Sequence, residues 1–322
     1  MRLTHNKGSL LSEAPRPRSG RLQGSSRDWN PASGFQSCAR DRVARVPALR
    51  YVVVDVFTDT ALAGNQLAVF TDARDLDADV MQALTREMNF SETTFLLPAE
   101  QGGTARVRIF NPSGEMRFAG HPVLGSAWVL AQPLQSGVIE LETGMGIVPV
   151  EIDRDESGSL VFGRTEQPIP EISMIHDPEA LLAVLGVESE LPVELYDNGA
   201  THIVVTLDSN DAVVALAPDS TAIARFGVTG VNCISGSGAK WKNRMFWPLG
   251  EDAATGSAAG PIACHACRHG LAEWGEWLEI SQGAEINRPS TLFARADGGD
   301  GGIERVFCGG RAVVVARGEF RL

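Results

Sequence analysis

The sequence contains little of what disulfide-linked or membrane-embedded proteins need. Its 322 residues include only five cysteines, an odd and scattered set that is not typical of a disulfide framework. No apolar run approaches the ~18 residues of a membrane span, and no apolar segment at the start resembles a secretory signal. We therefore expect a protein of a reducing, cytoplasmic environment that has no membrane partner.

The chain also lacks the short motifs of several catalytic classes. It has no Gly-x-x-x-x-Gly-Lys-Ser/Thr, no Gly-x-Gly-x-x-Gly that opens a strand–helix unit, no Gly-x-Ser-x-Gly elbow and no His-Glu-x-x-His. The sequence therefore gives no signal for nucleotide, serine-nucleophile or metal chemistry.

One local pattern could still bind a metal. Cys264 and Cys267 form a single Cys-x-x-Cys beside His265 and His269. All four are expected on one helix, which offers poor tetrahedral geometry. The alternative is a pair of ordinary, partly buried thiols. We adopt the second interpretation and predict no metal site.

Charge divides the chain into two unequal parts. Residues 1–50 hold 10 Lys and Arg against 3 Asp and Glu, whereas the rest holds 18 against 37. Residues 1–48 are rich in Arg, Ser, Gly and Pro without apolar periodicity, so we predict a disordered basic extension. The acidic remainder argues against a nucleic-acid partner.

From Leu49 onward the pattern is regular and rich in strands. Alternating or fully apolar runs predict strands, for example at 51–57, 66–70, 105–110 and 212–216. Helices are predicted at 77–88 and 123–130, and from the Asp252 segment to about His269. The helix at 123–130 is apolar all round, which is typical of a buried helix.

The order of small-residue turn, apolar helix and strands occurs twice. We predict an α+β fold of two pseudo-symmetric halves, each a curved sheet wrapped around a central helix. The predicted boundaries are 49–170 and 171–310, with 168–170 crossing between the halves. A final strand at 311–322 is predicted to complete the N-terminal half.

Two glycine-containing turns carry the functional signal. Phe118–Pro122 and Glu251–Ala258 each precede a predicted helix. Such turns leave backbone N–H groups unpaired at the positive end of a helix dipole, where an anion can bind. Since the two lie about half a chain apart, we expect them to face each other across one anionic ligand.

Three side chains near these turns could move protons. Glu92 lies at the mouth of an apolar strand, where burial can raise the pKa of a carboxyl group; the alternative is a solvated residue at a strand start. His121 and Asp252 could relay protons, or could only cap their helices. Gly256 and Ser257 could bind a carboxylate through backbone N–H groups and a hydroxyl, or serve as plain caps.

Together these residues resemble the phenazine-biosynthesis PhzF-like isomerase family. The matching segments occur in the family's order and cover residues 49 to about 317: Asp55–Phe57, Gly64–Phe70, Ser91–Phe95, Arg108–Pro112, Phe118–Gly125, Glu251–Ala258, Gln282–Gly283 and Arg288–Ser290.

The resemblance implies the diaminopimelate-epimerase-like fold, each half being a strand barrel around a helix, with the site in the cleft between the halves. It implies an isomerase that needs no cofactor and forms a homodimer. The family's acid/base glutamate maps onto Glu92, and its assisting His and Asp map onto His121 and Asp252. Its contacts to a small carboxylate substrate map onto Gly120, Gly256 and Ser257, to which we add Asn65 from the 64–70 segment.

Two alternatives lie on the same fold. Epimerases of this fold use two opposed cysteines, but this chain has Ala119 and Thr255 at those positions, which excludes two-thiol chemistry there. A non-catalytic binding protein with an intact cleft is the second alternative. The chain departs from the family pattern at Ala253, in place of a proline after Asp252, and in a short loop at Pro248–Gly250. Pro261 inside the second helix also removes a hydrogen bond.

Overall fold

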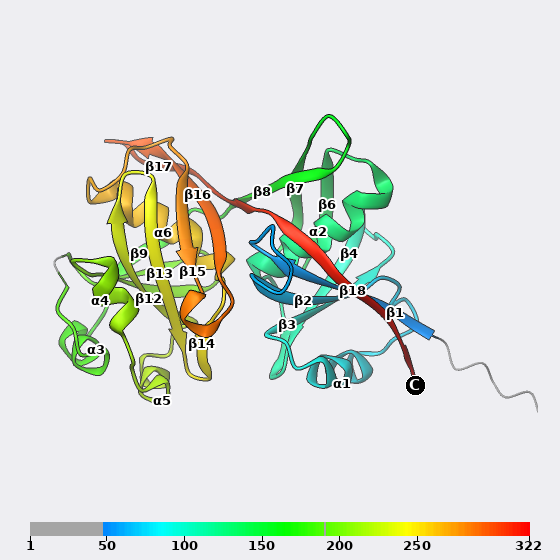
Figure 1. The fold of residues 1–322 in the computed structure, drawn as a ribbon, viewed down its shortest axis with the longest axis horizontal. Coiled ribbons are helices and arrows are strands. Elements are labelled where there is room, and N and C mark those ends of the chain that lie inside the picture. Colours follow the sequence, from blue (N-terminus) through cyan, green and yellow to red (C-terminus); the bar gives the residue numbers. More distant parts are fainter. Residues whose placement is uncertain (1–47, 190) are drawn as a thin grey trace, which may run out of the picture. The chain divides into compact units, whose positions relative to one another are not determined.

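The computed structural model describes residues 48–189 and 191–322. The predicted basic extension, apart from Ala48, lies outside the described residues, as does Cys38. The described chain alternates strands with few helices, and the predicted α+β class is confirmed (Figure 1).

The N-terminal half contains eight strands in chain order, two helices and a last strand that returns from the C-terminus. These elements are β1 (Ala48–Val56), β2 (Asn65–Phe70), α1 (Ala78–Met88), β3 (Glu92–Leu97), β4 (Ala105–Asn111), β5 (Gly114–Met116), α2 (Gly120–Leu134), β6 (Val138–Thr143), β7 (Gly146–Arg154), β8 (Leu160–Gln167) and β18 (Ala312–Arg321).

The C-terminal half lies between β8 and β18 in the sequence. Its elements are β9 (Glu171–Met174), α3 (Pro178–Leu185), β10 (Glu194–Asp197), β11 (Thr201–Thr206), α4 (Asn210–Ala215), α5 (Ser220–Ile223), β12 (Gly230–Ser237), β13 (Lys240–Trp247), β14 (Gly250–Asp252), α6 (Gly256–Arg268), β15 (Leu278–Gln282), β16 (Ser290–Gly299) and β17 (Gly302–Gly310).

The pattern of strand pairing repeats from one half to the other. In the N-terminal half β1 pairs antiparallel with β2, β2 parallel with β3, β3 antiparallel with β4, and β4 parallel with β6. In the C-terminal half β10, β11, β12, β13 and β15 pair in the same alternating order. A short hairpin strand, β5 or β14, precedes the central helix in each half. The predicted pseudo-symmetry is therefore confirmed in the hydrogen bonding itself.

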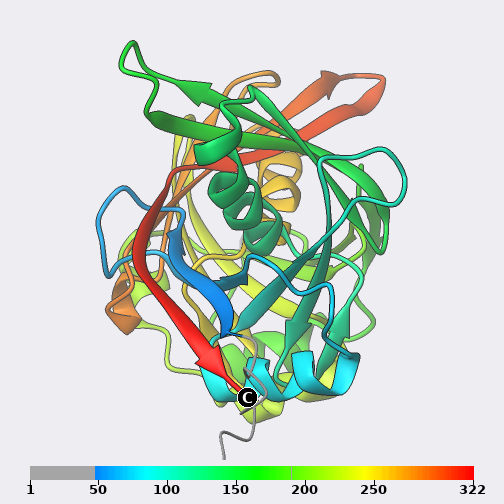
Figure 2. The ribbon, with the colours of Figure 1, turned by 90° about the vertical axis from the view of Figure 1, so that its right-hand side faces the viewer.

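A buried helix fills each half. Helix α2 contacts β1, β2, β3, β6, β7 and β8, and α6 contacts β11, β12, β16 and β17. Figure 2 shows α2 enclosed by strands, with α6 behind it. The first eight residues of α2 are all buried, as its uniformly apolar sequence predicts. A helix wrapped on every side has its N-terminus held in place by the whole barrel.

The chain passes between the halves twice. Residues 168–170 link β8 to β9, and β17 leads into β18, which pairs with β1 over nine residue pairs. Strands β8 and β17 also pair with each other across the two halves. The last strand therefore lies in the sheet that begins with the first one.

One predicted strand is wrong. Residues 210–215 form helix α4, where a strand was expected at 212–216. The Ser209 side chain accepts a hydrogen bond from Ala212 N–H at 3.2 Å and so caps a helix. A short apolar run such as Ala212–Ala215 fits a buried strand and a helix equally well, and the cap decides between them.

Pro261 does not stop α6, because side chains from outside the helix replace the lost bonds. Pro261 has no N–H to donate to the Ser257 carbonyl, and Asn198 Nδ2 donates to that oxygen at 2.9 Å instead. One residue earlier, Gln167 Nε2 donates to the Gly256 carbonyl at 2.9 Å, and Gly260 N–H donates to Gln167 Oε1 at 3.2 Å. The first turn of α6 is therefore held by β8 and by the loop after β10.

A buried ion pair joins the two halves near the start of β2. Arg288 Nη2 lies 2.7 Å from Asp55 Oδ1, and the Asp55 side chain is about 1% exposed. The same guanidinium donates to the carbonyls of Leu62, Ala63 and Gly64. Arg288 thereby positions the loop that leads into Asn65.

We predict that Arg288→Met lowers the free energy of unfolding by about 3 kcal/mol, because Asp55 is left buried and unpaired. Urea unfolding measures the change. Arg311→Met is the control, since its pair with Asp59 is exposed on both sides and worth less than about 1 kcal/mol. Equal losses in the two variants would show that the Arg288 pair does not hold the halves together.

Candidate functional site

A cavity of about 350 Å³ lies where the N-termini of α2 and α6 meet. Glu92, at the start of β3, lines it together with His121 from α2 and Asp252 from β14. Gly120, Gly256 and Ser257 also line it. Six of the seven predicted site residues, far apart in the sequence, are thus brought to one cavity.

The two helices approach each other backbone to backbone. A Cβ atom added to Gly120 would lie 2.9 Å from the Gly256 carbonyl carbon and 3.0 Å from the Ser257 nitrogen. The first N–H groups of a helix have no partner inside it, and the N-terminus carries a partial positive charge. Two such ends pointing into one cavity favour a bound anion.

Glu92 and His121 face each other at the wall of this cavity. His121 Nε2 lies 3.5 Å from Glu92 Oε2. This nitrogen is buried and makes no hydrogen bond to any residue that the structure describes. The imidazole is therefore free to bond to a group that enters the cavity.

Asp252 is fixed by its neighbours. Asn65 Nδ2 donates to Asp252 Oδ1 at 2.9 Å, and Thr255 Oγ1 donates to Asp252 Oδ2 at 2.7 Å. Asn65 also donates to the Ala254 carbonyl and accepts from Ser91 Oγ. Its amide is fully used and it does not line the cavity, so the structure gives Asn65 a supporting position behind Asp252 rather than the expected place against the ligand.

Burial shifts the protonation of all three groups toward their neutral forms. Loss of solvent raises the pKa of Glu92 to about 7, against which a hydrogen bond from Ser91 acts. Burial, together with repulsion from Glu92, raises the pKa of Asp252 to about 6. Burial lowers the pKa of His121 to about 4, although Asp252 opposes this shift. Near neutral pH, Glu92 can therefore both release and accept a proton beside an uncharged imidazole.

The rest of the cavity wall is mostly apolar. Its apolar side chains, which the sequence analysis did not single out, are Met116, Phe118, Val228, Met245, Trp247 and Pro248. They come from three separate segments, so no local pattern connects them. A cavity with apolar walls and polar groups at one end suits a small ring that carries a carboxylate.

The four cysteines that the structure describes are buried and unpaired, and none of them lines this cavity. Burial raises the pKa of Cys264 to about 12 and that of Cys267 to about 11, so both thiols stay protonated. Ala119 immediately precedes α2 and Thr255 immediately precedes α6, so neither helix N-terminus carries a thiol at its cap.

At the other end of α6, Glu194, His265 and His269 bring possible metal-binding atoms within 4.8 Å of one another. Arg268 Nη1 lies 2.9 Å from Glu194 Oε2, to which Tyr196 and His269 also bond. Although burial opposes ionisation, these donors hold the pKa of Glu194 well below its usual range. Arg268 already neutralises the Glu194 carboxylate, and its positive charge would repel a metal ion at this cluster.

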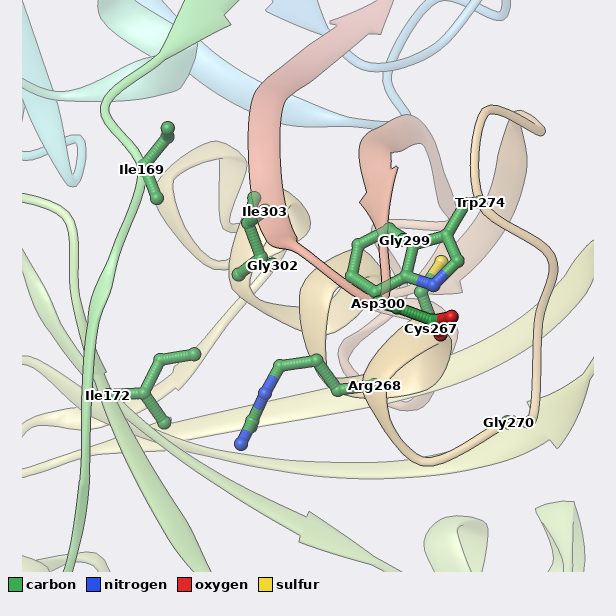
Figure 3. Close-up of a pocket in the computed structure, with 10 residues that line it drawn as sticks. All are labelled: Ile169, Ile172, Cys267, Arg268, Gly270, Trp274, Gly299, Asp300, Gly302 and Ile303. Carbon is green, nitrogen blue, oxygen red and sulfur yellow. The ribbon is translucent and has the colours of Figure 1, made fainter.

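A larger cavity of about 610 Å³ lies beside this cluster (Figure 3). Arg268 extends from α6 toward the strand that carries Ile172, and Trp274, Asp300 and Ile303 line other sides. The cavity contains neither helix N-terminus and none of the predicted proton-transfer residues. The smaller cavity is therefore the candidate active site.

The sequence analysis missed a set of buried polar side chains behind the site, four amides and one histidine. Gln282 was noticed only as part of a family segment. The others were not singled out at all: Asn198, Asn232, Asn243 and His202. Each lies in or beside a strand of the C-terminal half and none has a local motif. Only the sheet brings them together behind α6.

None of the described helices is long and apolar enough to cross a membrane.

Solved structures of distant sequence share this fold of two barrels, each around a central helix. A probable proline racemase from Agrobacterium radiobacter has this fold: it aligns with a TM-score of 0.59 at 12% identity, over 85% of this chain and 93% of that one.

Sequence comparison identifies the family. The profile described as phenazine biosynthesis-like protein matches residues 54–318. Trans-2,3-dihydro-3-hydroxyanthranilate isomerase from Pseudomonas fluorescens is 45% identical over 276 residues, which cover 84% of this chain and 99% of that protein. A predicted epimerase from Pseudomonas aeruginosa aligns with a TM-score of 0.74 at 31% identity, over 85% and 99% of the two chains. The chain belongs to the phenazine biosynthesis-like family and is an isomerase.

We predict that Glu92→Gln stabilises the protein at pH 8 by roughly 2–3 kcal/mol while leaving it nearly unchanged at pH 4. The unfolded carboxyl ionises near its ordinary value of 4.5, and the folded one near 7. Between these values the folded state holds a proton that the unfolded state has lost, so this residue lowers stability as pH rises through the window. Urea unfolding across pH measures the difference, with exposed Glu140→Gln as control. A gain in stability that does not depend on pH would contradict the raised pKa of Glu92 in the folded protein.

We predict that Gly120→Ala lowers the free energy of unfolding by about 1–3 kcal/mol, because the new methyl group meets backbone atoms that cannot rotate away. Gly137→Ala is the matched control, since a Cβ there has no neighbour within 4 Å. Thermal unfolding of both variants measures the effect, and equal midpoints would mean that the helix ends are not in close contact.

Proposed function

We propose that this isomerase moves a proton between two carbons of a small cyclic carboxylate, without a cofactor, and that Glu92 carries the proton. Trans-2,3-dihydro-3-hydroxyanthranilate, the compound named in its relatives, is the proposed substrate. The observation that carries the proposal is a largely buried carboxyl group, with a pKa of about 7, in a cavity that two helix N-termini line.

The helix ends hold the substrate carboxylate. The N–H groups of Gly120, His121, Gly256 and Ser257 belong to the first turns of α2 and α6 and are oriented without any rearrangement. Negative charge increases on a conjugated carboxylate when a proton leaves a carbon of the same system. Fixed donors at that position stabilise the transition state more than the substrate.

Glu92 suits a proton shuttle because its pKa lies close to neutral pH. The ionised form takes a proton from an sp³ ring carbon adjacent to double bonds that are conjugated with the carboxylate. The protonated form then returns it to another carbon of the same system, so that the enzyme ends unchanged. A general acid/base works best when its pKa is near the working pH.

His121 and Asp252 assist. The free Nε2 of neutral His121 can bond to a polar substituent of the ring beside Glu92. Asp252 accepts hydrogen bonds from Asn65 and Thr255 and faces the same cavity, where it can bind an amino or hydroxyl group. No step in this scheme requires a metal or an organic cofactor. A homodimer and a cytoplasmic location stay predictions from the resemblance and from the composition.

We predict that Glu92→Gln lowers turnover of trans-2,3-dihydro-3-hydroxyanthranilate by about 10²–10⁴, because the amide keeps the shape but cannot exchange a proton. Substrate affinity should fall far less, since the helix ends bind the carboxylate. Asp252→Asn and His121→Ala should give smaller losses. The reaction is followed in D₂O by NMR, which reports both product and deuterium at carbon.

The same measurement can overturn the proposal. If Glu92→Gln retains more than half of the wild-type exchange rate, another residue carries the proton. If the wild-type protein binds the compound but neither converts it nor exchanges deuterium, the substrate is a different one.

A further inference from the structure

The hydroxyl group of Ser257 has a buried partner on the side away from the cavity. His202 Nε2 lies 2.9 Å from Ser257 Oγ. His202 belongs to β11 and is completely buried, whereas Ser257 lines the cavity. Which of the two atoms donates depends on the tautomer of the histidine ring, and the surrounding structure determines that tautomer.

The assignment starts at Gln282, whose amide is oriented by backbone groups with unambiguous roles. Its Nε2 donates to the Asp252 carbonyl at 2.9 Å, and its Oε1 accepts from the Thr255 N–H at 3.3 Å. A carbonyl can only accept and an N–H can only donate, so the amide cannot be reversed. Gln282 Oε1 is therefore an acceptor.

Two buried asparagines carry this orientation to His202. Asn243 Nδ2 must donate to Gln282 Oε1, at 2.9 Å, and also donates to Asn232 Oδ1 at 3.2 Å. Asn232 Nδ2 is then the donor, toward His202 Nδ1 at 3.3 Å and the Ile203 carbonyl at 3.4 Å. His202 Nδ1 is thus an acceptor, and a neutral ring with this arrangement carries its proton on Nε2.

We propose that His202 is a positioning residue: by donating from Nε2 to Ser257 Oγ, it leaves the serine hydroxyl proton available as a dedicated donor to the substrate carboxylate. This inference rests on the proposed function for the identity of the anion. An O–H group bonded to a carboxylate is a charge-assisted donor and stronger than a neutral one.

The surroundings support this arrangement. Asn232, Asn243 and Gln282 are at most about 1% exposed, so water does not compete for their bonds. Burial lowers the pKa of His202 to about 4, although the charge of Asp197 acts in the opposite direction. The ring therefore stays neutral near pH 7.

Asn243 is the branch point of the network. One of its hydrogens begins the path through Asn232 and His202 to Ser257. The other bonds to Gln282, whose Nε2 donates to Thr255 Oγ1 at 2.9 Å, and Thr255 donates to Asp252. In both branches each side chain donates to the next one away from Asn243. One branch ends at the Asp252 carboxylate, and the other ends at the carboxylate of the substrate.

This arrangement excludes a serine nucleophile. An activated serine needs a histidine nitrogen that accepts its proton. His202 Nε2 is already protonated and therefore cannot act as that base. Ser257 and His202 are close enough to resemble a catalytic pair, but the direction of the hydrogen bond is the reverse.

The tautomer can be measured without a substrate. In protein labelled with ¹⁵N-histidine, the ring signals of His202, identified by their loss in His202→Gln, should show a proton on Nε2 and a bare Nδ1 from pH 5 to 8. His176→Gln, at an exposed site, controls for the substitution. A proton on Nδ1, or a charged ring, would overturn the proposal whatever the enzyme's activity.

The effect on the ligand is tested with a double-mutant cycle. The probe is 3-hydroxyanthranilate, the aromatic analogue of the proposed substrate, and its affinity is measured by calorimetry. Ser257→Ala should weaken binding about 5- to 30-fold, and His202→Met about 3- to 10-fold, as for lost hydrogen bonds. In the Ser257→Ala background, His202→Met should have no further effect, and His202→Gln, which restores a donor, should recover most of the wild-type affinity.

The outcomes separate the two proposals. If His202→Met weakens binding equally with and without Ser257, while thermal unfolding shows intact folds, His202 does not act through the serine and the inference fails. If the tautomer is as expected but the wild type does not bind the probe, the arrangement of Ser257 stands and the proposed substrate fails. If binding and coupling are as expected but turnover is absent, only the proposed reaction fails.

Discussion

The close contact between two helix N-termini is the constraint on which the rest of this structure depends. Two positive helix ends repel each other, and only glycine at residues 120 and 256 allows this contact, because a Cβ atom at either residue would lie about 3 Å from backbone atoms of the other helix. Nothing in the contact itself favours this arrangement; the barrels impose it, because each surrounds its helix with strands. An anion bound between the ends relieves the repulsion. The fold therefore favours negative charge at this one place, where we propose that the substrate carboxylate binds.

The same place holds two acidic side chains that the fold keeps near neutrality. Glu92 and Asp252 would also be attracted to the helix ends, yet burial and mutual repulsion raise the pKa of each. A full negative charge is thus left for the ligand to supply. His121 stays uncharged for the same reason, so no buried cation competes for the carboxylate. In the proposed mechanism, proton exchange near neutral pH follows from the burial of these three groups.

The second half of the site needs more support than the first, because Pro261 interrupts the bonding of α6. Asn198 and Gln167 replace the missing helix bonds, and the amide network behind them orients Ser257. At the cavity end of helix α2 the proline is residue 122, in the first turn, where no helix bond is lost, and the second proline of α2, Pro133, lies in its last turn. The pseudo-symmetric halves therefore reach a similar geometry in different ways. In our proposal, the C-terminal half supplies a side-chain donor to the anion as well as backbone N–H donors.

Local sequence pattern was sufficient to predict most of the helices and strands and the two glycine turns before the central helices. Apolar periodicity and glycine–helix junctions act over only a few residues. Local pattern predicted the halves, the central helices and the residues Glu92, His121, Asp252, Gly120, Gly256 and Ser257 that meet in the cavity. It failed at 212–216, where a serine cap outweighed an apolar run, and it misplaced Asn65, which supports Asp252 from behind. The sequence by itself determined which residues could bind an anion or move a proton. Only the tertiary structure decided their pKa values, the direction of the hydrogen bond between His202 and Ser257, and the apolar wall, because burial and the pairing of distant strands are properties of the folded chain alone.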